Sequence, residues 1–260
     1  MSPILLIDGD QFLYRACAAC EEEVRWDEEN HVLYSNAIKA TKTAIGSIEK
    51  VVAKFEPSQV RLAFTKTESF RKSLYEPYKG NRIDMRKPMA YVRVREALEE
   101  KYKSLSLPGL EADDILGIWA TRDDKDYIIV SDDKDLRTIP CTLYRQGKLE
   151  TITQAEADYN WLYQTLVGDT ADNFPGCPGI GPAKAEKFLG PSPSPELVGQ
   201  TPQADPWWPF TAEVYWKHAL SAFEKAGKTA DEALTQARLA RILRATDWDT
   251  DKKEVILWTP

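Results

Sequence analysis

The chain has 260 residues, enough for one large α/β domain or for a core domain with a smaller appendage. Hydrophobic residues make up 43%, which can form a buried core, whereas the formal net charge of −7 does not at first suggest a nucleic-acid partner. No apolar run approaches the length of a membrane span and the N-terminal segment lacks a basic leader, so we expect a cytoplasmic protein without a membrane partner.

Three apolar runs predict the buried strands of a mostly parallel sheet. They cover residues 4–7, 60–64 and 127–130, and each stops abruptly at polar residues. Residues 35–55 carry apolar side chains at helical spacing and predict a crossover helix between the first two strands. A strand–helix–strand unit of this kind places helices on both faces of the sheet, so the predicted class is α/β. A further helix is expected from Glu111 onward, and a hairpin over residues 142–152.

After about residue 153 the pattern becomes helical, which suggests a division of the chain. We expect residues 1–153 to form a core with acidic clusters and a basic segment at about 71–105, and residues 154–260 to form a C-terminal helical domain. Prolines at about 190–210 predict a linker. Beyond it, Thr229 and Glu232 predict a capping box ahead of a helix that continues to Leu243.

The charge is unevenly distributed along the chain. From Arg71 to Lys103 there are ten Lys or Arg against five Asp or Glu, and acids elsewhere gather in short clusters. Carboxylates that hold divalent cations must be counted together with their metals, which reverse the local sign. The acidic total therefore does not exclude a DNA-binding enzyme.

Acidic residues follow two of the predicted strands at the points where those strands end. Asp8 and Asp10 follow the first strand, and Asp133 and Asp135 follow the strand at 127–130. Because ligands of open α/β sheets bind beyond the carboxyl ends of the strands, we expect these acids to meet at one sheet edge. Two further clusters, one opening a predicted helix and one at i, i+3 spacing, complete the set with Glu111, Asp113, Asp114, Asp169 and Asp172.

Any one of these clusters is more simply interpreted as helix caps, turn residues or solvated surface. Several of them together favour a metal site, because carboxylates packed together repel each other unless cations neutralise them. Oxygen ligands in a chain with two His suit two Mg²⁺ ions, or Mn²⁺ in their place, better than zinc. The same scarcity of His leaves little support for a Ser/His/Asp triad, and Cys17 and Cys20 are interpreted as structural.

Taken in order, several motifs resemble the 5′-nuclease, or flap endonuclease, family, which includes the 5′-nuclease domain of bacterial DNA polymerase I. They are LIDG at 6–9, YKGNR at 78–82, EADD at 111–114, SDDKDL at 131–136 and GDTADNFPG at 168–176. The tail, with ARIL at 240–243 and ILW at 256–258, is similar to the free-standing exonucleases of short-tailed phages. That similarity implies a phage source and hence the host cytoplasm.

The resemblance implies a structure-selective 5′–3′ exonuclease or flap endonuclease. Its partner would be DNA with a 5′ end, nick or flap, and RNA in RNA–DNA hybrids would be an additional substrate. It assigns Asp8, Glu111, Asp113 and Asp114 to a first metal. It assigns the second metal, or the water shell of that metal, to Asp133, Asp135, Asp169 and Asp172.

The resemblance also implies the DNA contacts. Tyr78, Lys79 and Arg82 match the base of the arch beside which the 5′ end passes, where Tyr can stack on a base and the two cations can stabilise charge on the phosphate. Residues 166–189 resemble a helix–hairpin–helix element with a monovalent cation. Its DNA-binding residues would be Gly176, Gly179, Gly181 and Lys184, while the positive funnel would comprise Arg71, Lys72, Arg86, Lys87, Arg93 and Arg95.

One departure from the family pattern concerns an aspartate that normally follows the second strand. This chain has FTKTE at 64–68, so Glu68 or Asp10 is expected to compensate. If neither does, the first metal would bind more weakly. Two alternatives therefore stay open: a branched-DNA binding protein that has lost catalysis, and an acidic-site ribonuclease, which would lack the glycine hairpin and the basic arch. The sequence makes no prediction of the oligomeric state.

Overall fold

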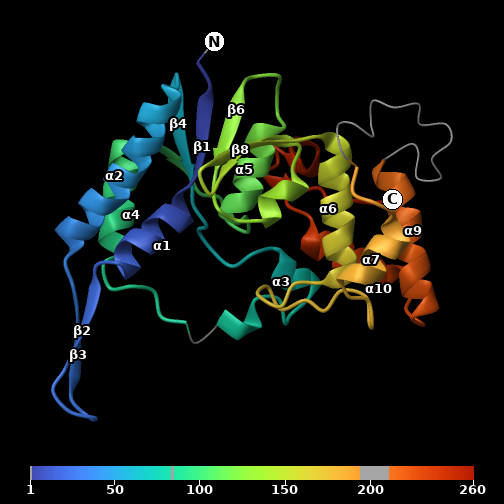
Figure 1. The fold of residues 1–260 in the computed structure, drawn as a ribbon, viewed down its shortest axis with the longest axis horizontal. Helices are drawn as coiled ribbons and strands as arrows, with labels where there is room; N and C mark the ends of the chain where they lie inside the picture. Colours follow the sequence, from blue (N-terminus) through green and yellow to red (C-terminus); the bar gives the residue numbers. More distant parts are fainter. Residues whose placement is uncertain (1, 83–84, 194–210) are drawn as a thin grey trace.

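The computed structural model describes residues 2–82, 85–193 and 211–260. At its centre lies a six-stranded sheet of order β5-β4-β1-β6-β7-β8 (Figure 1). Neighbouring strands pair in parallel except for β7 and β8, which form an antiparallel hairpin. The strands are Ile4–Asp8 (β1), Gln59–Ala63 (β4), Lys103–Leu105 (β5), Tyr127–Val130 (β6), Cys141–Arg145 (β7) and Lys148–Ile152 (β8).

Helices cover both faces of this sheet, as the apolar runs predicted. On one face lie α1 (Gly9–Ala18), α2 (Ala37–Phe55) and α4 (Tyr91–Lys101), and on the other lies α5 (Ala112–Ala120). Side chains alternate along β1, so Leu5 and Ile7 pack with the first group while Ile4 and Leu6 pack with α5. The α/β class is confirmed.

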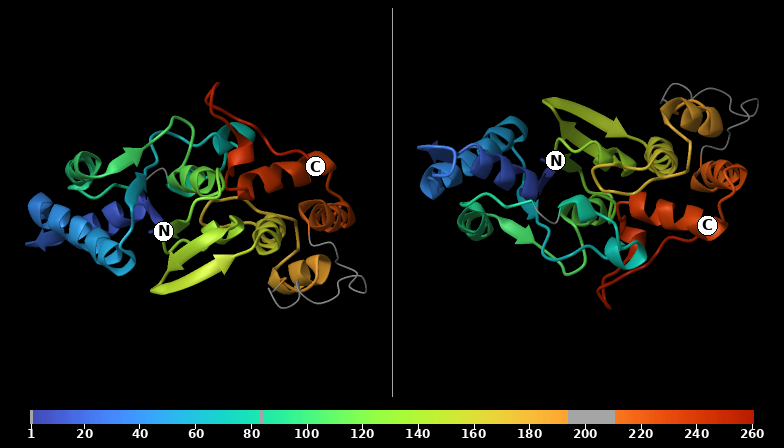
Figure 2. Two further views of the ribbon diagram at one scale, coloured as in Figure 1. Left: turned by 90° about the horizontal axis from the view of Figure 1, so that it is seen from above. Right: turned by 90° about the horizontal axis from the view of Figure 1, so that it is seen from below.

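The C-terminal helices lie at the opposite end of the molecule from α1 and α2 (Figure 2). They are α6 (Gln154–Val167), α7 (Pro182–Leu189), α9 (Ala212–Lys225) and α10 (Ala230–Ala240), and they pack around a core of their own that includes Trp161 and Tyr215. The predicted capping box of Thr229 and Glu232 is present at the start of α10. Most of the predicted linker, residues 194–210, falls outside the described residues.

The tail departs from the predicted division of the chain. Helix α10 ends at Ala240 instead of continuing, and Ile242 and Leu243 join the core beneath α5. The helix stops there because tertiary partners replace its backbone bonds: Leu243 N donates to Asp114 Oδ1 at 3.1 Å. The remaining short elements of the tail are η4 (Ala245–Asp247), β9 (Trp248–Asp249) and β10 (Glu254–Val255).

The predicted arch segment is also divided by the structure. Its first part contains α3 (Arg71–Leu74) and the 3₁₀ turn η1 (Gly80–Arg82), which lie below the sheet in Figure 1. Its second part, α4 and β5, belongs to the core, where Val94 and Leu98 are buried. A protruding hairpin of β2 (Glu21–Arg25) and β3 (His31–Ser35) was not predicted. In the described part of the chain, no helix is both long and apolar enough to cross a membrane.

Candidate active site

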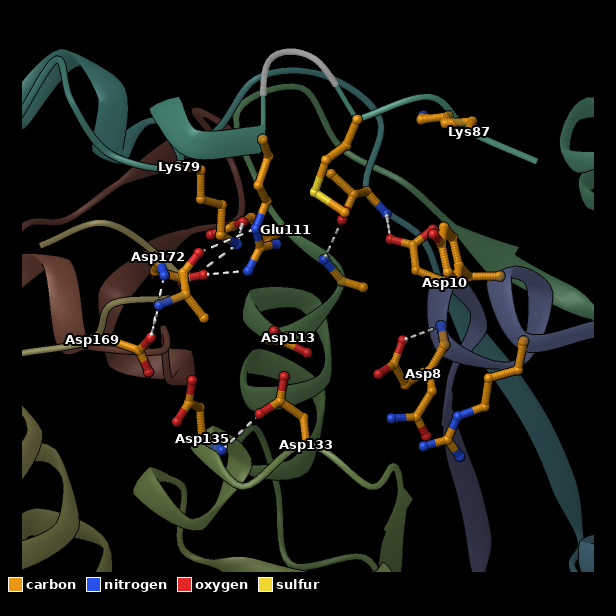
Figure 3. Close-up of a pocket in the computed structure, with 18 of the residues that line it drawn as sticks. Asp8, Asp10, Lys79, Lys87, Glu111, Asp113, Asp133, Asp135, Asp169 and Asp172 are labelled. Atoms are coloured by element: carbon orange, nitrogen blue, oxygen red, sulfur yellow. Dashed lines mark hydrogen bonds and ion pairs between the residues drawn. The ribbon is translucent and has the colours of Figure 1, made fainter. Parts of the chain in front are cut away.

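A cavity of about 620 Å³ opens at the carboxyl edge of the sheet, beside α5 (Figure 3). Its lining combines acids from segments that are far apart in the sequence with basic side chains from α1, η1 and the segment after it. The acids meet here because parallel strands present their carboxyl ends to the same edge. They are Asp8, Asp10, Glu111, Asp113, Asp133, Asp135, Asp169 and Asp172.

Asp8 is both the last residue of β1 and the N-cap of α1, which places its carboxylate at the sheet edge. One oxygen accepts the backbone N–H of Gln11 at 3.1 Å, and the other accepts the hydroxyl of Ser131 at 2.8 Å. The side chain is buried, and burial raises its pKa to about 6, although these hydrogen bonds act in the opposite direction. Nearby carboxylates add to the increase. Asp8 is thus firmly positioned in a place that disfavours its charge.

Asp113 and Asp135 have the same kind of environment. Burial raises the pKa of Asp113 well above its usual range, and the charges of Asp8 and Asp133 raise it further. Burial, followed by the charge of Asp133, also raises the pKa of Asp135, which begins the 3₁₀ turn η2 (Asp135–Thr138). Asp133 orders this turn by accepting the N–H of Asp135 at 2.9 Å. Carboxylates that repel each other in this way favour either protons or divalent cations.

Glu111, the N-cap of α5, has a contrasting environment. Its carboxylate contacts the ammonium of Lys79 and accepts hydrogen bonds from Tyr78 Oη and Arg71 Nη1, both at 3.0 Å. Burial by itself would raise its pKa, but Lys79 and Arg71 outweigh burial and lower the pKa to about 2. Glu111 therefore remains ionised next to acids that resist ionisation.

Lys79 lies at the base of the predicted arch in an unusual backbone conformation. Its φ of 53° is left-handed, and its N–H donates to the Asp172 carbonyl at 2.8 Å. This conformation costs a non-glycine residue about 1–3 kcal/mol, so it persists only where the surroundings enforce it. Lys79 Nζ is 3.5 Å from Asp172 Oδ2, and Arg82 Nη2 is 2.7 Å from Asp172 Oδ1. The two cations of the arch base thus border the acids directly.

Asp169 and Asp172 lie in the loop that follows α6. Asp169 Oδ1 accepts the N–H groups of Ala171 at 2.7 Å and Asp172 at 3.2 Å. Burial would raise the pKa of Asp169, but the ammonium of Lys134 and these N–H groups lower it. Burial raises the pKa of Asp172, despite the opposing charge of Lys79.

Arg71 and Asp114 form a buried ion pair, which corrects the roles predicted for both. Arg71 Nη2 is 2.7 Å from Asp114 Oδ1, and the two residues are 2% and 0% exposed. Asp114 also accepts the N–H groups of Glu111 and Leu243 at 3.1 Å. Arg71 is therefore not available as part of a positive surface, and the oxygens of Asp114 are committed to partners other than a metal. The pair instead joins α3, α5 and the tail.

Two other predicted contacts are corrected by burial. The Tyr78 ring is 2% exposed and stacks on Phe174 with ring centroids 6.4 Å apart, so it cannot stack on a base. Gly176 is buried, and its N–H donates to Gln236 Oε1 at 2.9 Å, so it cannot bind phosphate. In the same loop, Gly179 and Gly181 are exposed.

The two acids proposed to compensate for the missing aspartate differ in position. Asp10 lines the cavity and accepts the N–H of Thr65 at 2.8 Å, in the loop after β4 where that aspartate was expected. Its other oxygen accepts the Tyr91 hydroxyl at 3.1 Å. Glu68 instead pairs with Lys72, and its side chain is 67% exposed. The structure therefore favours Asp10 as the acid next to the site.

The other predicted basic residues differ in how they relate to the cavity. Arg86 and Lys87 line it, although Arg86 is paired with Glu21. Arg95 donates to the carbonyl of Thr65 at 2.8 Å, and Lys184 donates to the carbonyl of Gly179 at 2.8 Å. Arg93 is exposed on α4.

Sequence reasoning missed several residues that organise the site. Ser131 and Lys134 both lie within the SDDKDL motif, so their position among the acids was the available signal. Lys134 Nζ lies 2.7 Å from Asp135 Oδ1 and 2.9 Å from Asp169 Oδ2. Tyr14, on α1, lines the cavity with 44% of its surface exposed, but its spacing alone gave no signal.

The oxygen-rich set of donors suits a hard cation such as Mg²⁺ or Mn²⁺. Within residues 2–82, 85–193 and 211–260, however, no three His, Cys, Asp or Glu side chains are already arranged as a metal site. Lysine ammonium groups lie between several of the acids instead. The oxygen donors fit divalent cations chemically, while Lys79 and Lys134 supply positive charge between the acids in this structure.

A family model described as "5′-3′ exonuclease, N-terminal resolvase-like domain" matches residues 3–161. The chain belongs to this family and is a nuclease. It is 34% identical to the exodeoxyribonuclease of Enterobacteria phage T3 and 32% identical to the exonuclease of Escherichia phage T7, over 99% of this chain and 93% of each relative. The predicted family and the predicted similarity to phage exonucleases are confirmed.

Solved structures support the fold. The T5 D15 protein, co-crystallised with metal ions, matches with a TM-score of 0.61 over 94% of this chain and 90% of its own. A complex of T5 D15 flap endonuclease with DNA and metal ions matches with a TM-score of 0.58. Their sequence identities of 13% and 14% show a shared architecture only.

Proposed function

We propose that the chain is a divalent-metal-dependent, structure-selective 5′ nuclease that hydrolyses DNA phosphodiesters near a 5′ end, nick or flap. The observation that carries this proposal is the meeting of acids with raised pKa values and the cationic arch base around one cavity. The acids supply positions for cations, while Lys79 and Arg82 supply positive charge for a phosphate. The relationship to exonucleases and to DNA-bound neighbours is consistent with this division of labour.

We assign the proposed metal ligands to two groups. Two divalent cations bound there, Mg²⁺ or Mn²⁺, would activate a water molecule and stabilise the charge that develops on the phosphodiester. Asp10 would take the place of the missing aspartate next to the first group. Its carboxylate accepts the N–H of Thr65, in the loop where that aspartate was expected. The first group comprises Asp8, Glu111 and Asp113, and the second comprises Asp133, Asp135, Asp169 and Asp172.

Residues of the arch base would act on the phosphate itself. Lys79 and Arg82 are held by Asp172, which keeps both cations within reach of a phosphate between the acids and the arch. Tyr78 would act as a positioning residue, since its hydroxyl oxygen lies 3.0 Å from Glu111 Oε2 and 2.9 Å from Asp172 Oδ2 and its one proton is shared between the two carboxylates. Burial raises its pKa well above the usual range, so it remains a neutral donor.

The DNA would extend from the cavity over two surfaces. Tyr14, which is 44% exposed, would stack on an unpaired base, and Arg86 and Lys87 line the same cavity. On the other side, α6, the loop 168–181 and α7 would serve as the helix–hairpin–helix element. There the exposed backbone of Gly179 and Gly181 precedes the start of α7, which suits a duplex phosphate together with a monovalent cation.

A labelled-substrate assay tests this function. A 5′-labelled flap and a nicked duplex are incubated with Mg²⁺ or with EDTA, with an RNA–DNA hybrid as a third substrate. We expect release of label from both DNA substrates with Mg²⁺ only, and Asp113→Asn should abolish release while leaving the gel shift in place. Binding without release in every condition would instead indicate a branched-DNA binding protein. Cleavage confined to RNA would indicate a ribonuclease.

A further inference from the structure

Lys134 connects two acids that come from different parts of the chain. It precedes η2, and its ammonium lies 2.7 Å from Asp135 Oδ1 and 2.9 Å from Asp169 Oδ2. Asp169 is 35 residues further along the sequence, in the loop after α6. A single positive charge thus bridges the sheet edge and the C-terminal helices inside the proposed second metal group.

The partners of this bridge are anchored in different ways. The backbone holds the Asp169 carboxylate, because its Oδ1 accepts the N–H of Ala171 at 2.7 Å. Asp135 is held through its own backbone, since its N–H begins η2 by donating to Asp133 Oδ1 at 2.9 Å. The Lys134 side chain is 67% exposed, whereas that of Asp169 is 8% exposed. The lysine can therefore withdraw into solvent with little loss of packing, and the acids would stay where they are.

Lys79 makes a similar bridge between Glu111 and Asp172. Its side chain is 21% exposed, and its backbone is held in the left-handed conformation. Lys79 is therefore held within the site, whereas the exposed Lys134 side chain can move away from its two acids.

We propose that Lys134 is a tethered counter-ion, which keeps Asp135 and Asp169 together in the metal-free protein and competes with a divalent cation for the same two carboxylates. This inference rests on the proposed metal site. The physical reason is that two carboxylates in a partly buried setting need a neighbouring positive charge. A lysine supplies one charge, and a divalent cation supplies two and can displace it.

Metal binding to the DNA-free protein tests this role. Mn²⁺ is titrated calorimetrically into the wild type, Lys134→Met and Lys134→Arg, with Lys101→Met as the control. Lys101 forms an exposed pair with Glu49 away from the cavity, so its loss removes a lysine ion pair of ordinary surface type. Thermal unfolding in EDTA is measured on the same four proteins.

We expect Lys134→Met to bind Mn²⁺ about two- to fivefold more tightly than the wild type, which is the range that one exposed ion pair supports. Its melting temperature in EDTA should be lower. Lys134→Arg, which keeps the charge, and Lys101→Met should both resemble the wild type in Mn²⁺ affinity.

If the wild type binds Mn²⁺ and Lys134→Met binds it with the same or lower affinity, this inference is overturned and the proposed function stands. Absence of Mn²⁺ binding by the wild type overturns both the inference and the metal-dependent function.

Discussion

The hydroxyl of Ser131 joins Asp8 to Asp133 at the carboxyl ends of β1 and β6. It donates to Asp8 Oδ2 at 2.8 Å and accepts the N–H of Asp133 at 3.1 Å. This small side chain thus orients one acid from each of two neighbouring strands. A hydrogen bond to a charged group contributes about 1.5–3 kcal/mol, so the arrangement is strong enough to affect activity.

Ser131→Ala should therefore lower kcat/KM on a nicked duplex by about tenfold, because Asp8 would lose its orientation and its charge would become still less favourable. The protein should remain folded, since alanine fills nearly the same space. Ser58→Ala is a matched control, because the Ser58 hydroxyl lies 3.1 Å from the Ser2 carbonyl and 3.2 Å from the Pro3 carbonyl and shares its one proton between them, far from the cavity. Equal activity of the two variants would argue against a positioning role for Ser131.

The contribution of Asp8 to the stability of the metal-free protein should decrease as pH rises from 5 to 7.5. Burial raises the folded-state pKa of Asp8 to about 6 from the usual 3.8, so the folded state binds this proton more tightly than the unfolded chain does. The stability that this proton provides is fully present below the pKa that Asp8 has in the unfolded chain, and it is lost as pH rises through 6, the pKa of Asp8 in the folded protein. Between pH 5 and 7.5 the loss amounts to about 1 kcal/mol from this group.

Thermal unfolding in EDTA across this range provides the measurement. Mg²⁺ should raise the melting temperature more at pH 7.5 than at pH 5, because the cation replaces the proton. Glu111, whose pKa is lowered to about 2, loses its contribution only below this window and does not mask the effect. An Asp8→Asn variant with the same pH dependence as the wild type would contradict the assignment.

Arg71→Met should destabilise the fold by about 3–5 kcal/mol, because it leaves Asp114 and Glu111 buried without their common cation. Lys72→Met, at the neighbouring exposed position, should change the free energy of unfolding by less than about 0.5 kcal/mol. Urea unfolding of both variants provides the test. A loss below about 1 kcal/mol for Arg71→Met would show that the pair contributes little to stability.

Asp10→Asn and Glu68→Gln separate the two candidates for the compensating acid. Asp10 lines the cavity and bonds to Thr65, so its neutral variant should require several times more Mg²⁺ for half-maximal cleavage. Glu68 pairs with Lys72 at an exposed position, so Glu68→Gln should have the Mg²⁺ requirement of the wild type. If Glu68→Gln raises the Mg²⁺ requirement and Asp10→Asn does not, Glu68 is the acid that replaces the missing aspartate.

The features predicted correctly from sequence are those that depend on local pattern. Apolar runs of strand length indicated β1, β4 and β6, and acids directly after two of them indicated the functional edge of the sheet. These predictions succeed because strand direction and the side-chain period are properties of a few consecutive residues. The motif order likewise indicated the family that the comparisons confirmed.

Burial and pairing over long distances could not be predicted in the same way. Arg71 is a cation in a basic segment, and only the position of Asp114, 43 residues away, makes it a buried structural residue. Tyr78 is likewise enclosed by Phe174 and bound to Asp172, which belong to the loop after α6. The sequence by itself determined the strands, the acids that follow them and the family to which this chain belongs. The tertiary structure decided which charged groups line the cavity and which form buried ion pairs around it. The physical reason is that the free energy of a charge depends on its solvent exposure and its partners.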